Sequence, residues 1–172
     1  MDSKRRFALG SAMLAVAAAV ALSACGFQLR GSGSRVNLPF KTLHLGFPDT
    51  SSLGNELKRN IRSGSGTTLV VDPKAAEASV ELLSEAREKL TLTLNTQGRI
   101  REYSLLYKVS FQVRNNQGKE LLAPTEVVLK RDISFNESQV MAKEKEEELL
   151  YRDMQSDLVK QILRRLAALK PV

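Results

Sequence analysis

The chain has 172 residues, with 26 lysines and arginines against 19 aspartates and glutamates, which gives a formal net charge of +7. Its single cysteine, Cys25, excludes an internal disulfide, and its single histidine, His44, excludes the histidine and cysteine clusters that hold transition metals. A basic surface of this kind favours an anionic partner, either lipid phosphates or an acidic face of another protein.

The first 24 residues are organised as a cleaved secretory signal. Residues 4–6 are basic, residues 7–22 form a mostly apolar segment and residues 23–24 are small. The apolar segment is shorter than the about 20 residues that a membrane-spanning helix needs. The tetrapeptide LSAC resembles the bacterial lipobox, whose cysteine becomes the first residue of the mature protein and carries a lipid. We therefore expect lipidation of Cys25; the alternative is an ordinary signal with a chance cysteine.

This interpretation divides the chain into a signal peptide over residues 1–24, a lipidated tether over residues 25–40 and one periplasmic domain over residues 41–172. An aspartate after the cysteine favours the inner membrane in lipoproteins of this type, so Gly26 implies the periplasmic side of the outer membrane. Glycine and serine in the tether make it a flexible spacer. The domain is long enough to bury a core without a disulfide, and nucleic acid is a poor partner in the periplasm.

The first part of the domain predicts a strand, a helix and a second strand. Residues 41–47 alternate between apolar and polar side chains, as expected for a strand with one buried face. Residues 52–63 carry Leu53, Leu57 and Ile61 at intervals of four, which is typical of a helix with one apolar stripe. Residues 67–71 are rich in β-branched side chains, so they predict the second strand, followed by a turn.

Three further strands follow, joined by short turns that imply an antiparallel meander. Residues 79–94 have apolar side chains mostly at even positions, which predicts a long strand with its even face buried and a bulge near residues 86–88. Residues 102–114 alternate more cleanly, with the odd positions from Tyr103 to Val113 facing inward. Residues 126–135 predict the last strand, and Pro124 marks its irregular start.

A long helix ends the chain. Asn136 is its expected N-cap, with Gln139 as capping-box partner, and the helix extends to about Leu169 with an apolar stripe at intervals of four. The order of elements predicts an α+β fold: a two-layer sandwich of a mixed, mostly antiparallel β-sheet with two helices packed on one face.

Catalysis is not expected for this chain. An enzyme brings acid, base or nucleophilic groups together, whereas this sequence has one histidine and no Gly-x-Ser-x-Gly motif. A lone histidine on a strand is more often a surface residue than a catalyst. We therefore expect no enzymatic activity, no metal and no cofactor apart from the covalent lipid on Cys25.

Several sequence motifs together resemble the LptE family of lipopolysaccharide-assembly lipoproteins, and they occur in the family's order along nearly the whole mature chain. They are CGFQLRG at 25–31, REY at 101–103, Ala142-Lys143 with three glutamates at 146–148, and QILRRL at 161–166. The resemblance implies a non-enzymatic plug inside the outer-membrane β-barrel LptD, which supports barrel assembly and helps deliver lipopolysaccharide to the outer leaflet. The alternative is a free periplasmic lipoprotein that binds a lipid or another amphiphile.

Three basic residues, Arg99, Arg101 and Lys143, are the candidates for contact with lipopolysaccharide phosphates. Arg99 and Arg101 lie near the tip of the longest predicted hairpin, and their spacing of two aims both side chains to one face. Lys143 lies in the first turns of the last helix. Lysine and arginine bind phosphate by charge-assisted hydrogen bonds, so the three could hold one anion if they lie together. Whether they do depends on strand register, which the sequence does not fix. The alternative is that they are hydrated surface charges.

Overall fold

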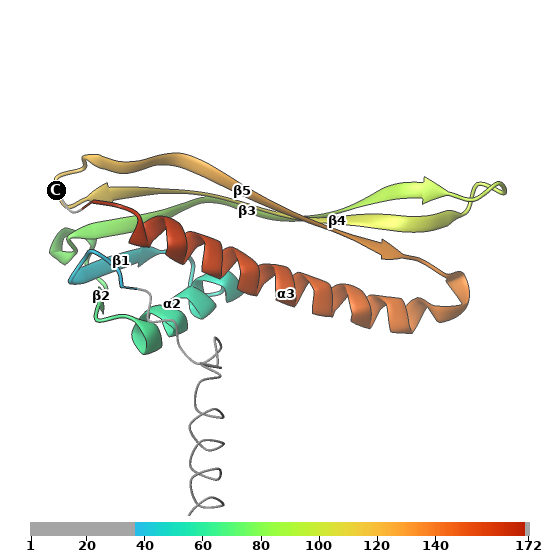
Figure 1. Ribbon diagram of the computed structural model, residues 1–172, viewed down its shortest axis with the longest axis horizontal. Helices are drawn as coiled ribbons and strands as arrows, with labels where there is room; N and C mark the ends of the chain where they lie inside the picture. The colour runs from blue at the N-terminus through green and yellow to red at the C-terminus, as the bar shows by residue number, and fades with distance from the viewer. Residues whose placement is uncertain (1–36, 171–172) are drawn as a thin grey trace, which may run out of the picture. The chain divides into compact units, whose positions relative to one another are not determined.

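The computed structural model describes residues 37–170, so Cys25, the signal and most of the tether lie outside the described residues. Its five strands form one sheet in the order β2-β1-β3-β4-β5, and the two helices α2 and α3 lie on one face of that sheet (Figure 1). The predicted α+β sandwich with a mixed, mostly antiparallel sheet is confirmed.

The first three elements follow the sequence prediction closely. They are β1 at Thr42–Gly46, α2 at Ser52–Gly64 and β2 at Thr68–Val70, with β1 parallel to both β2 and β3. The Ser51 side chain caps α2 by accepting a hydrogen bond from the Gly54 amide at 3.0 Å. The predicted apolar stripe of α2 is buried, so this helix packs into the core by the face that its periodicity indicated.

The meander consists of β3 at Ala78–Leu94, β4 at Ile100–Asn115 and β5 at Glu120–Ser134. The two turns between these strands have nearly the same sequence, Asn-x-Gln-Gly, and the same geometry. In each, the asparagine side chain accepts bonds from the backbone two and four residues on, and glycine adopts positive φ, +76° at Gly98 and +79° at Gly118. Such tight turns hold the neighbouring strands antiparallel.

The central strand, β4, behaves as its alternation predicted. The odd positions Leu105, Tyr107, Val109, Phe111 and Val113 are fully buried against the helices and the neighbouring strands. They join the apolar faces of β1 and α2 and the last turns of α3 in one core.

The prediction that the even residues of β3 face the core is correct as far as Leu82 and wrong beyond it. Val80 pairs with Val113 and Leu82 with Phe111, but Leu83 is an extra residue, because Ser84 already pairs with Ser110. A single-residue bulge moves every later side chain to the opposite face. From Ser84 to Thr91 the odd residues, such as Arg87, therefore face the helices, while Leu90 points away and is 52% exposed. Two further register shifts, between Thr91 and Thr93 and between Thr93 and Leu94, follow near the hairpin tip, where Leu92 and Leu94 are 43% and 56% exposed. The bulge lies at Leu83 rather than near residues 86–88.

Two element boundaries also differ from the prediction. β5 begins at Glu120, six residues before the predicted start at residue 126. The strand continues through Pro124 because proline is tolerated in an edge strand where the register shifts. Asn136 caps a short 3₁₀ turn at Glu137–Gln139 by accepting from the Ser138 amide. The α-helix α3 starts after this turn, at Val140–Ala167, and Gln139 makes no capping bond from its side chain, so the predicted capping box is wrong.

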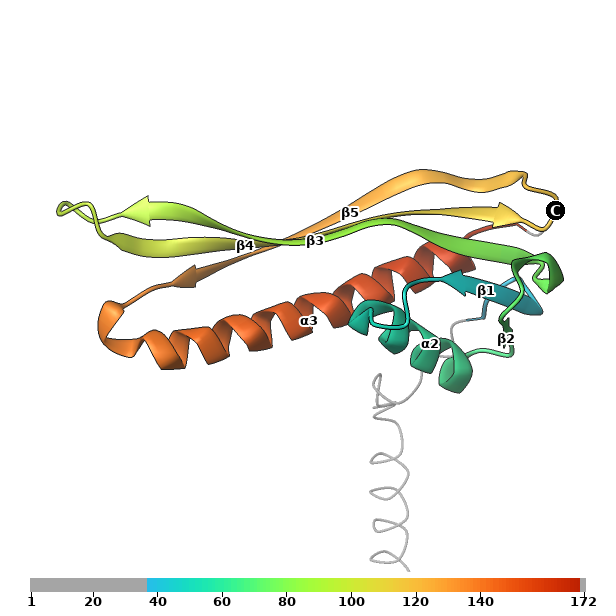
Figure 2. The ribbon, with the colours of Figure 1, turned by 180° about the vertical axis from the view of Figure 1, so that it is seen from behind.

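The long helix α3 and the meander extend well past the core, as Figures 1 and 2 show from two sides. We call the end that contains β1, β2 and α2 the proximal half, and the end that contains the tip of the β3–β4 hairpin and the start of α3 the distal half. Of the predicted stripe of α3, Met154, Leu158, Ile162 and Leu166 are fully buried in the proximal half, whereas Leu150 is only partly buried. The distal part of α3 instead exposes Val140, Met141 and Leu149.

Candidate functional site

The sequence-predicted basic residues lie in the distal half, where strand register brings the hairpin tip to the start of α3. The Arg99 guanidinium lies 3.1 Å from the Glu137 carboxylate, which belongs to the 3₁₀ turn before α3. The Phe135 amide donates to the Arg101 carbonyl at 2.7 Å. These contacts settle the question that the sequence left open: the segment leading into α3 does reach the hairpin tip.

Lys143 projects from the first turns of α3 toward the end of β5. Its ammonium donates to the Ser134 hydroxyl at 3.0 Å and to the Glu146 carboxylate at 2.9 Å, and only 17% of its side chain is exposed. Arg101 is left unmatched by β3 at a register shift, between Glu102 and Ile100, and no ion pair of Arg101 is present among residues 37–170. The three candidates thus share one end of the domain, but carboxylates already pair with Arg99 and Lys143.

A fourth cation, Lys89, belongs to the same region and was not among the predicted site residues. Its ammonium lies 2.6 Å from Glu147 of α3 and 4.2 Å from the centre of the Tyr103 ring, a cation–π geometry. The sequence placed Lys89 on the outward face, and only the bulge at Leu83 turns it toward α3. No local pattern reveals that reversal.

A hollow of about 220 Å³ separates the hairpin from α3 at this point. Lys89 and Lys143 line it together with the aromatic rings of Tyr103 and Phe135, which meet edge to face at 5.2 Å. Glu144 and Glu147 line the same hollow, so the lysines are balanced by carboxylates. We call this the distal hollow. It combines balanced charges with two aromatic rings.

The opposite face of the sheet carries both apolar and charged side chains. Leu90 of β3 and Val128 of β5 are exposed there, on the same face as the Lys108–Glu88 and Lys130–Asp132 ion pairs. Leu92 and Leu94 are also exposed, toward the hairpin tip. Exposed leucines in a row on one strand form an unusual surface for a chain that is only in contact with water. The distal half therefore presents cations toward α3 and several exposed leucines on β3.

A polar network connects the sheet to both helices midway along the domain. The Arg87 guanidinium donates to Gln155 of α3 at 3.0 Å and to the Tyr107 hydroxyl at 3.2 Å, and it lies 4.6 Å from the centre of the Tyr107 ring. The Tyr107 hydroxyl in turn donates to Glu85 at 2.5 Å. Burial, together with this bond to Glu85, raises the pKa of Tyr107 to about 12.

The same network holds α2 against α3. Gln155 donates to Glu56 at 2.6 Å and accepts from Ser52 at 2.7 Å, while the Ser156 hydroxyl donates to Glu56 at 2.8 Å. Every charged group in the network is thus matched by hydrogen bonds, which is what a polar cluster within a fold requires. We assign it to positioning the helices rather than to binding.

Metal clusters and membrane-spanning helices are both absent from the described residues. Residues 37–170 contain no group of three or more histidine, cysteine, aspartate or glutamate side chains placed to hold a metal ion. Among the same residues, neither helix combines the length and apolar character that crossing a membrane requires.

Comparison with known proteins points to one family. The model of the family described as "LptE: Lipopolysaccharide-assembly" matches residues 40–166. This range contains the full sheet, α2 and nearly all of α3. No functionally curated protein matches the chain.

Three solved structures are similar in sequence and fold. An uncharacterized lipoprotein B from Nitrosomonas europaea is 36% identical, with a TM-score of 0.72 over 83% of this chain and 91% of its own. A rare lipoprotein B from Shewanella oneidensis is 29% identical, with a TM-score of 0.63 over 74% and 94%. A minor lipoprotein from Acinetobacter baumannii is 25% identical, with a TM-score of 0.62 over 78% and 98%.

Proposed function

Because this chain belongs to the LptE family of lipopolysaccharide-assembly proteins, we propose that it plugs the LptD β-barrel, supports the assembly of that barrel and helps deliver lipopolysaccharide to the outer leaflet. The observation that carries the proposal is the family match over residues 40–166, which spans all five strands. Members of this family are non-enzymatic, outer-membrane-associated lipoproteins. The finer assignments, the barrel partner and the lipid contacts, are our proposals.

The surface of the distal half supports a role with an amphiphilic lipid. Lipopolysaccharide combines phosphate groups with acyl chains, and the distal half combines Lys89, Lys143 and Arg99 with exposed leucines on β3. Charge-assisted hydrogen bonds from lysine and arginine are the usual means of holding phosphate.

The barrel partnership is tested by affinity purification of the tagged full chain from detergent-solubilised membranes. We expect one large outer-membrane barrel protein to co-purify in equal molar amount. A chain that purifies alone while carrying bound lipid would instead support the alternative, a free amphiphile-binding lipoprotein.

The lipid contacts are tested by reversing the charge of Arg99, Arg101 and Lys143 together. We expect the triple glutamate variant to bind lipopolysaccharide more weakly at low salt. The matched control reverses three exposed basic residues of the proximal half, Arg59, Arg62 and Lys74, and so makes the same change in net charge. Equal affinity of the two triple variants would exclude a specific contact at the distal end.

Anchoring through Cys25 remains a proposal from the sequence, since this residue precedes the described part of the chain. The serine variant of Cys25 should lose incorporation of a fatty-acid analogue, because no other residue of the lipobox carries a thiol. The domain should still fold, since Cys25 lies before the Gly/Ser spacer. Label retained on that variant would contradict lipidation at this position.

A further inference from the structure

β3 has a long free edge in the distal half. Its neighbour β1 pairs with it only as far as Glu81, whereas β3 itself continues to Leu94. Figure 2 shows β1 staying in the half that holds α2, while β3 runs on toward the hairpin tip. Among the described residues, no strand lies on that side of β3 beyond Glu81. A free strand edge offers its backbone N–H and C=O groups to another extended chain.

Strand register identifies the backbone groups at this edge. The Phe135 amide donates to the Arg101 carbonyl, so the odd residues of β4 bond to β5 and its even residues bond to β3. From Ser84 to Leu90, the even residues of β4 pair with the even residues of β3. The odd residues of β3 in this stretch therefore direct their backbone N–H and C=O groups to the free edge. They are Glu85, Arg87 and Lys89.

The devices that usually protect a strand edge do not block this one. Prolines, bulges and outward charges discourage the addition of a strand. β3 contains no proline, and its bulge at Leu83 lies before the stretch of free odd residues. The Arg87 and Lys89 side chains bond to residues of α3 beneath the sheet, so their charges are held away from the edge. The backbone of this stretch is therefore open to a partner strand.

A hollow of about 760 Å³ opens where β1 leaves β3. It is lined by the end of β1, by the loop before α2 and by β3 on both sides of the bulge. Pro48 lies on its rim just past β1, and Leu83 beside it is 47% exposed. A strand added in line with β1 would begin in this hollow. We call the hollow, together with the edge of β3 from Ser84 to Thr91, the β3 edge site.

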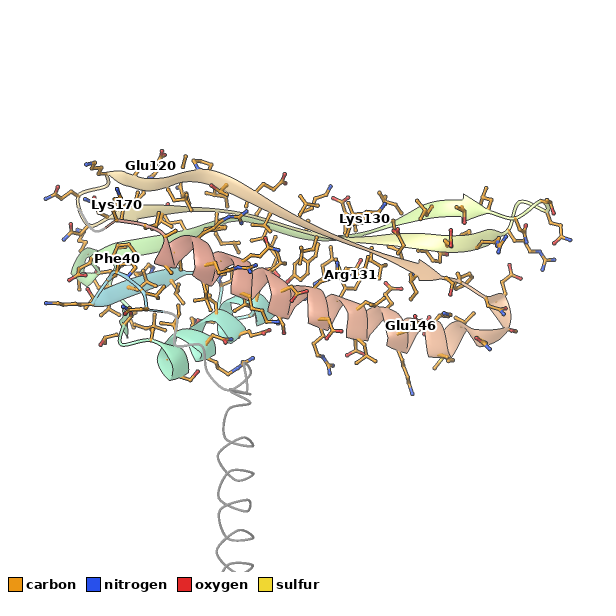
Figure 3. The ribbon with its side chains drawn as sticks, viewed as in Figure 1. Phe40, Glu120, Lys130, Arg131, Glu146 and Lys170 are labelled. Atoms are coloured by element: carbon orange, nitrogen blue, oxygen red, sulfur yellow. The ribbon has the colours of Figure 1, made fainter. Side chains whose placement is uncertain are left out.

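The other long free edge, that of β5, is less suited to a partner strand. Even residues of β5 direct their backbone groups outward, because its odd residues bond to β4. The outward carbonyl of Lys130 already accepts a hydrogen bond from the Arg131 guanidinium at 3.0 Å; Figure 3 labels both residues partway along β5. Pro124 of the same strand has no N–H to donate. Of the two edges, that of β3 is therefore the one open to strand addition.

We propose that the β3 edge site binds an extended segment of the barrel partner, which joins the sheet as a strand in line with β1. This inference rests on the proposed function as a plug. The strands of a closed barrel already pair with each other, so the segment is a loop of the barrel that folds into the lumen. Because one plug fills one lumen, a second copy of this chain is not the occupant.

The side chains around the β3 edge site favour a segment that alternates between apolar and acidic residues. Successive side chains of an added strand point to opposite faces of the sheet. On the open face they would lie beside Ala86 and Leu90, which are both exposed. On the helix side they would lie beside Arg87, which is also exposed and would attract a carboxylate.

The first test maps cross-links from the full-length chain in intact cells. A photoreactive amino acid replaces Ala86 in one variant and Leu90 in another, and mass spectrometry locates the cross-linked residues of the barrel. We expect both variants to react with one segment, at sites about four residues apart, because paired strands rise equally along their lengths. The same amino acid at Val71, which is 93% exposed just past β2, should not react with that segment.

The second test removes one outward N–H from the edge. Lys89→Pro does so without breaking a bond to β4, since proline is tolerated at a strand edge. Lys89→Ala loses the same side-chain contacts but keeps the N–H, so it is the matched control. With the photoreactive amino acid at Ala86, we expect Lys89→Pro to lower the cross-link yield about tenfold relative to Lys89→Ala. Val128→Pro makes the same change at the edge of β5 and should leave the yield unchanged.

Three outcomes would overturn the proposal. The first is cross-linking of Ala86 and Leu90 to separate parts of the barrel, as contact with its wall would give. The second is an equal yield from Lys89→Pro and Lys89→Ala. The third is cross-linking only to a second copy or to a protein other than the barrel. Equal melting temperatures of the two Lys89 variants exclude misfolding, and the spacing of the cross-links needs no proline variant.

Failure of this inference differs from failure of the proposed function. A barrel that co-purifies with the native chain, but gives either of the first two outcomes, would leave the role as a plug intact and exclude strand addition at β3. A native chain that purifies without any barrel would contradict both.

Discussion

At the scale of single residues, two close contacts join the helices to the sheet, one at a glycine of α2 and one at a buried tyrosine of β4. Gly54 in the first turn of α2 lies directly against Phe47, which follows β1. Tyr107 in the middle of β4 is fully buried, yet its hydroxyl is held by a carboxylate and a guanidinium. Both residues fasten α2 or α3 to the sheet.

Gly54→Ala should destabilise the protein by about 1–3 kcal/mol, in the range of overpacked core sites. A Cβ at this position would lie 2.6 Å from the Phe47 Cβ, and neither atom is the flexible end of a side chain. Gly64→Ala at the other end of α2 is the matched control, because a Cβ there meets nothing within 4 Å, and alanine favours a helix. Urea denaturation of both variants measures the difference; equal stabilities would show that Phe47 moves aside freely.

Tyr107 should make the protein sensitive to alkaline pH. Its pKa is raised from 10.0 to about 12 by burial and by the bond to Glu85, so the folded state favours the protonated phenol. The resulting stability is fully present below pH 10 and is lost as pH rises toward about 12, at no more than about 1.4 kcal/mol for each pH unit. Denaturation across this range should show the decline in the native protein, and Tyr107→Phe should reduce the slope. The same slope in both proteins would assign the effect to other groups.

At the scale of elements, the bulge in β3 decides which residues of the hairpin reach the helices. Leu83 separates residues 78–82, whose even members face the core, from residues 84–91, whose odd members do so. Arg87 and Lys89 thereby gain their partners on α3, and Leu90 turns to the open face. One inserted residue thus decides which side chains of this segment face α3.

Leu90→Ser tests this reversal. Since Leu90 is half exposed, the substitution should change the free energy of unfolding by no more than about 0.5 kcal/mol. Leu105→Ala, at a fully buried position of β4 paired with Lys89, should cost about 2–5 kcal/mol. A large loss of stability for Leu90→Ser would mean that the even residues of β3 face the core along the whole strand.

Leu158→Ala tests the apolar stripe of α3 in the same way. The side chain is fully buried in the core beneath the sheet, so its truncation should cost about 2–5 kcal/mol. Leu149→Ala on the same helix is the control, because Leu149 is 56% exposed and should change stability little. Thermal melting distinguishes the two, and similar shifts would indicate that the helix packs on a different face.

At the scale of the whole molecule, burial is concentrated in the proximal half. The fully buried side chains of β1, α2, β4 and α3 meet there in one core. The distal hairpin has less support, because β1 pairs with β3 only as far as Glu81 and leaves the rest of that edge without a strand among the described residues. The proximal half thus holds most of the packing that stabilises the fold.

Hydrogen exchange should reveal this gradient. Amides of β4 between Leu105 and Val113 should exchange only with global unfolding, whereas those near the hairpin turn, residues 91–99, should exchange through local opening. Mass spectrometry of peptides from the native protein measures both segments. Equal protection in the two halves would show that the hairpin unfolds together with the core.

Much of this fold was predictable from the sequence, because its elements carry strong local periodicity. Alternation from Tyr103 to Val113 identified β4 and its buried face, and intervals of four identified the stripes of α2 and the proximal part of α3. These patterns arise from the geometry of the strand and the helix themselves, with periods of 2.0 and 3.6 residues. They require no knowledge of what the element packs against.

Only the tertiary structure decided the register between the strands. That register in turn decided which residues of the candidate site lie together. The sequence suggested that Arg99, Arg101 and Lys143 could act together, but Arg99 meets Glu137 only because β5 and β4 pair in one particular register. Likewise, Lys89 reaches Glu147 only because Leu83 is left unmatched by β4. The physical reason is that a bulge or a register is set by the partner strand, through contacts between residues far apart in the chain, and a local pattern holds no information about it.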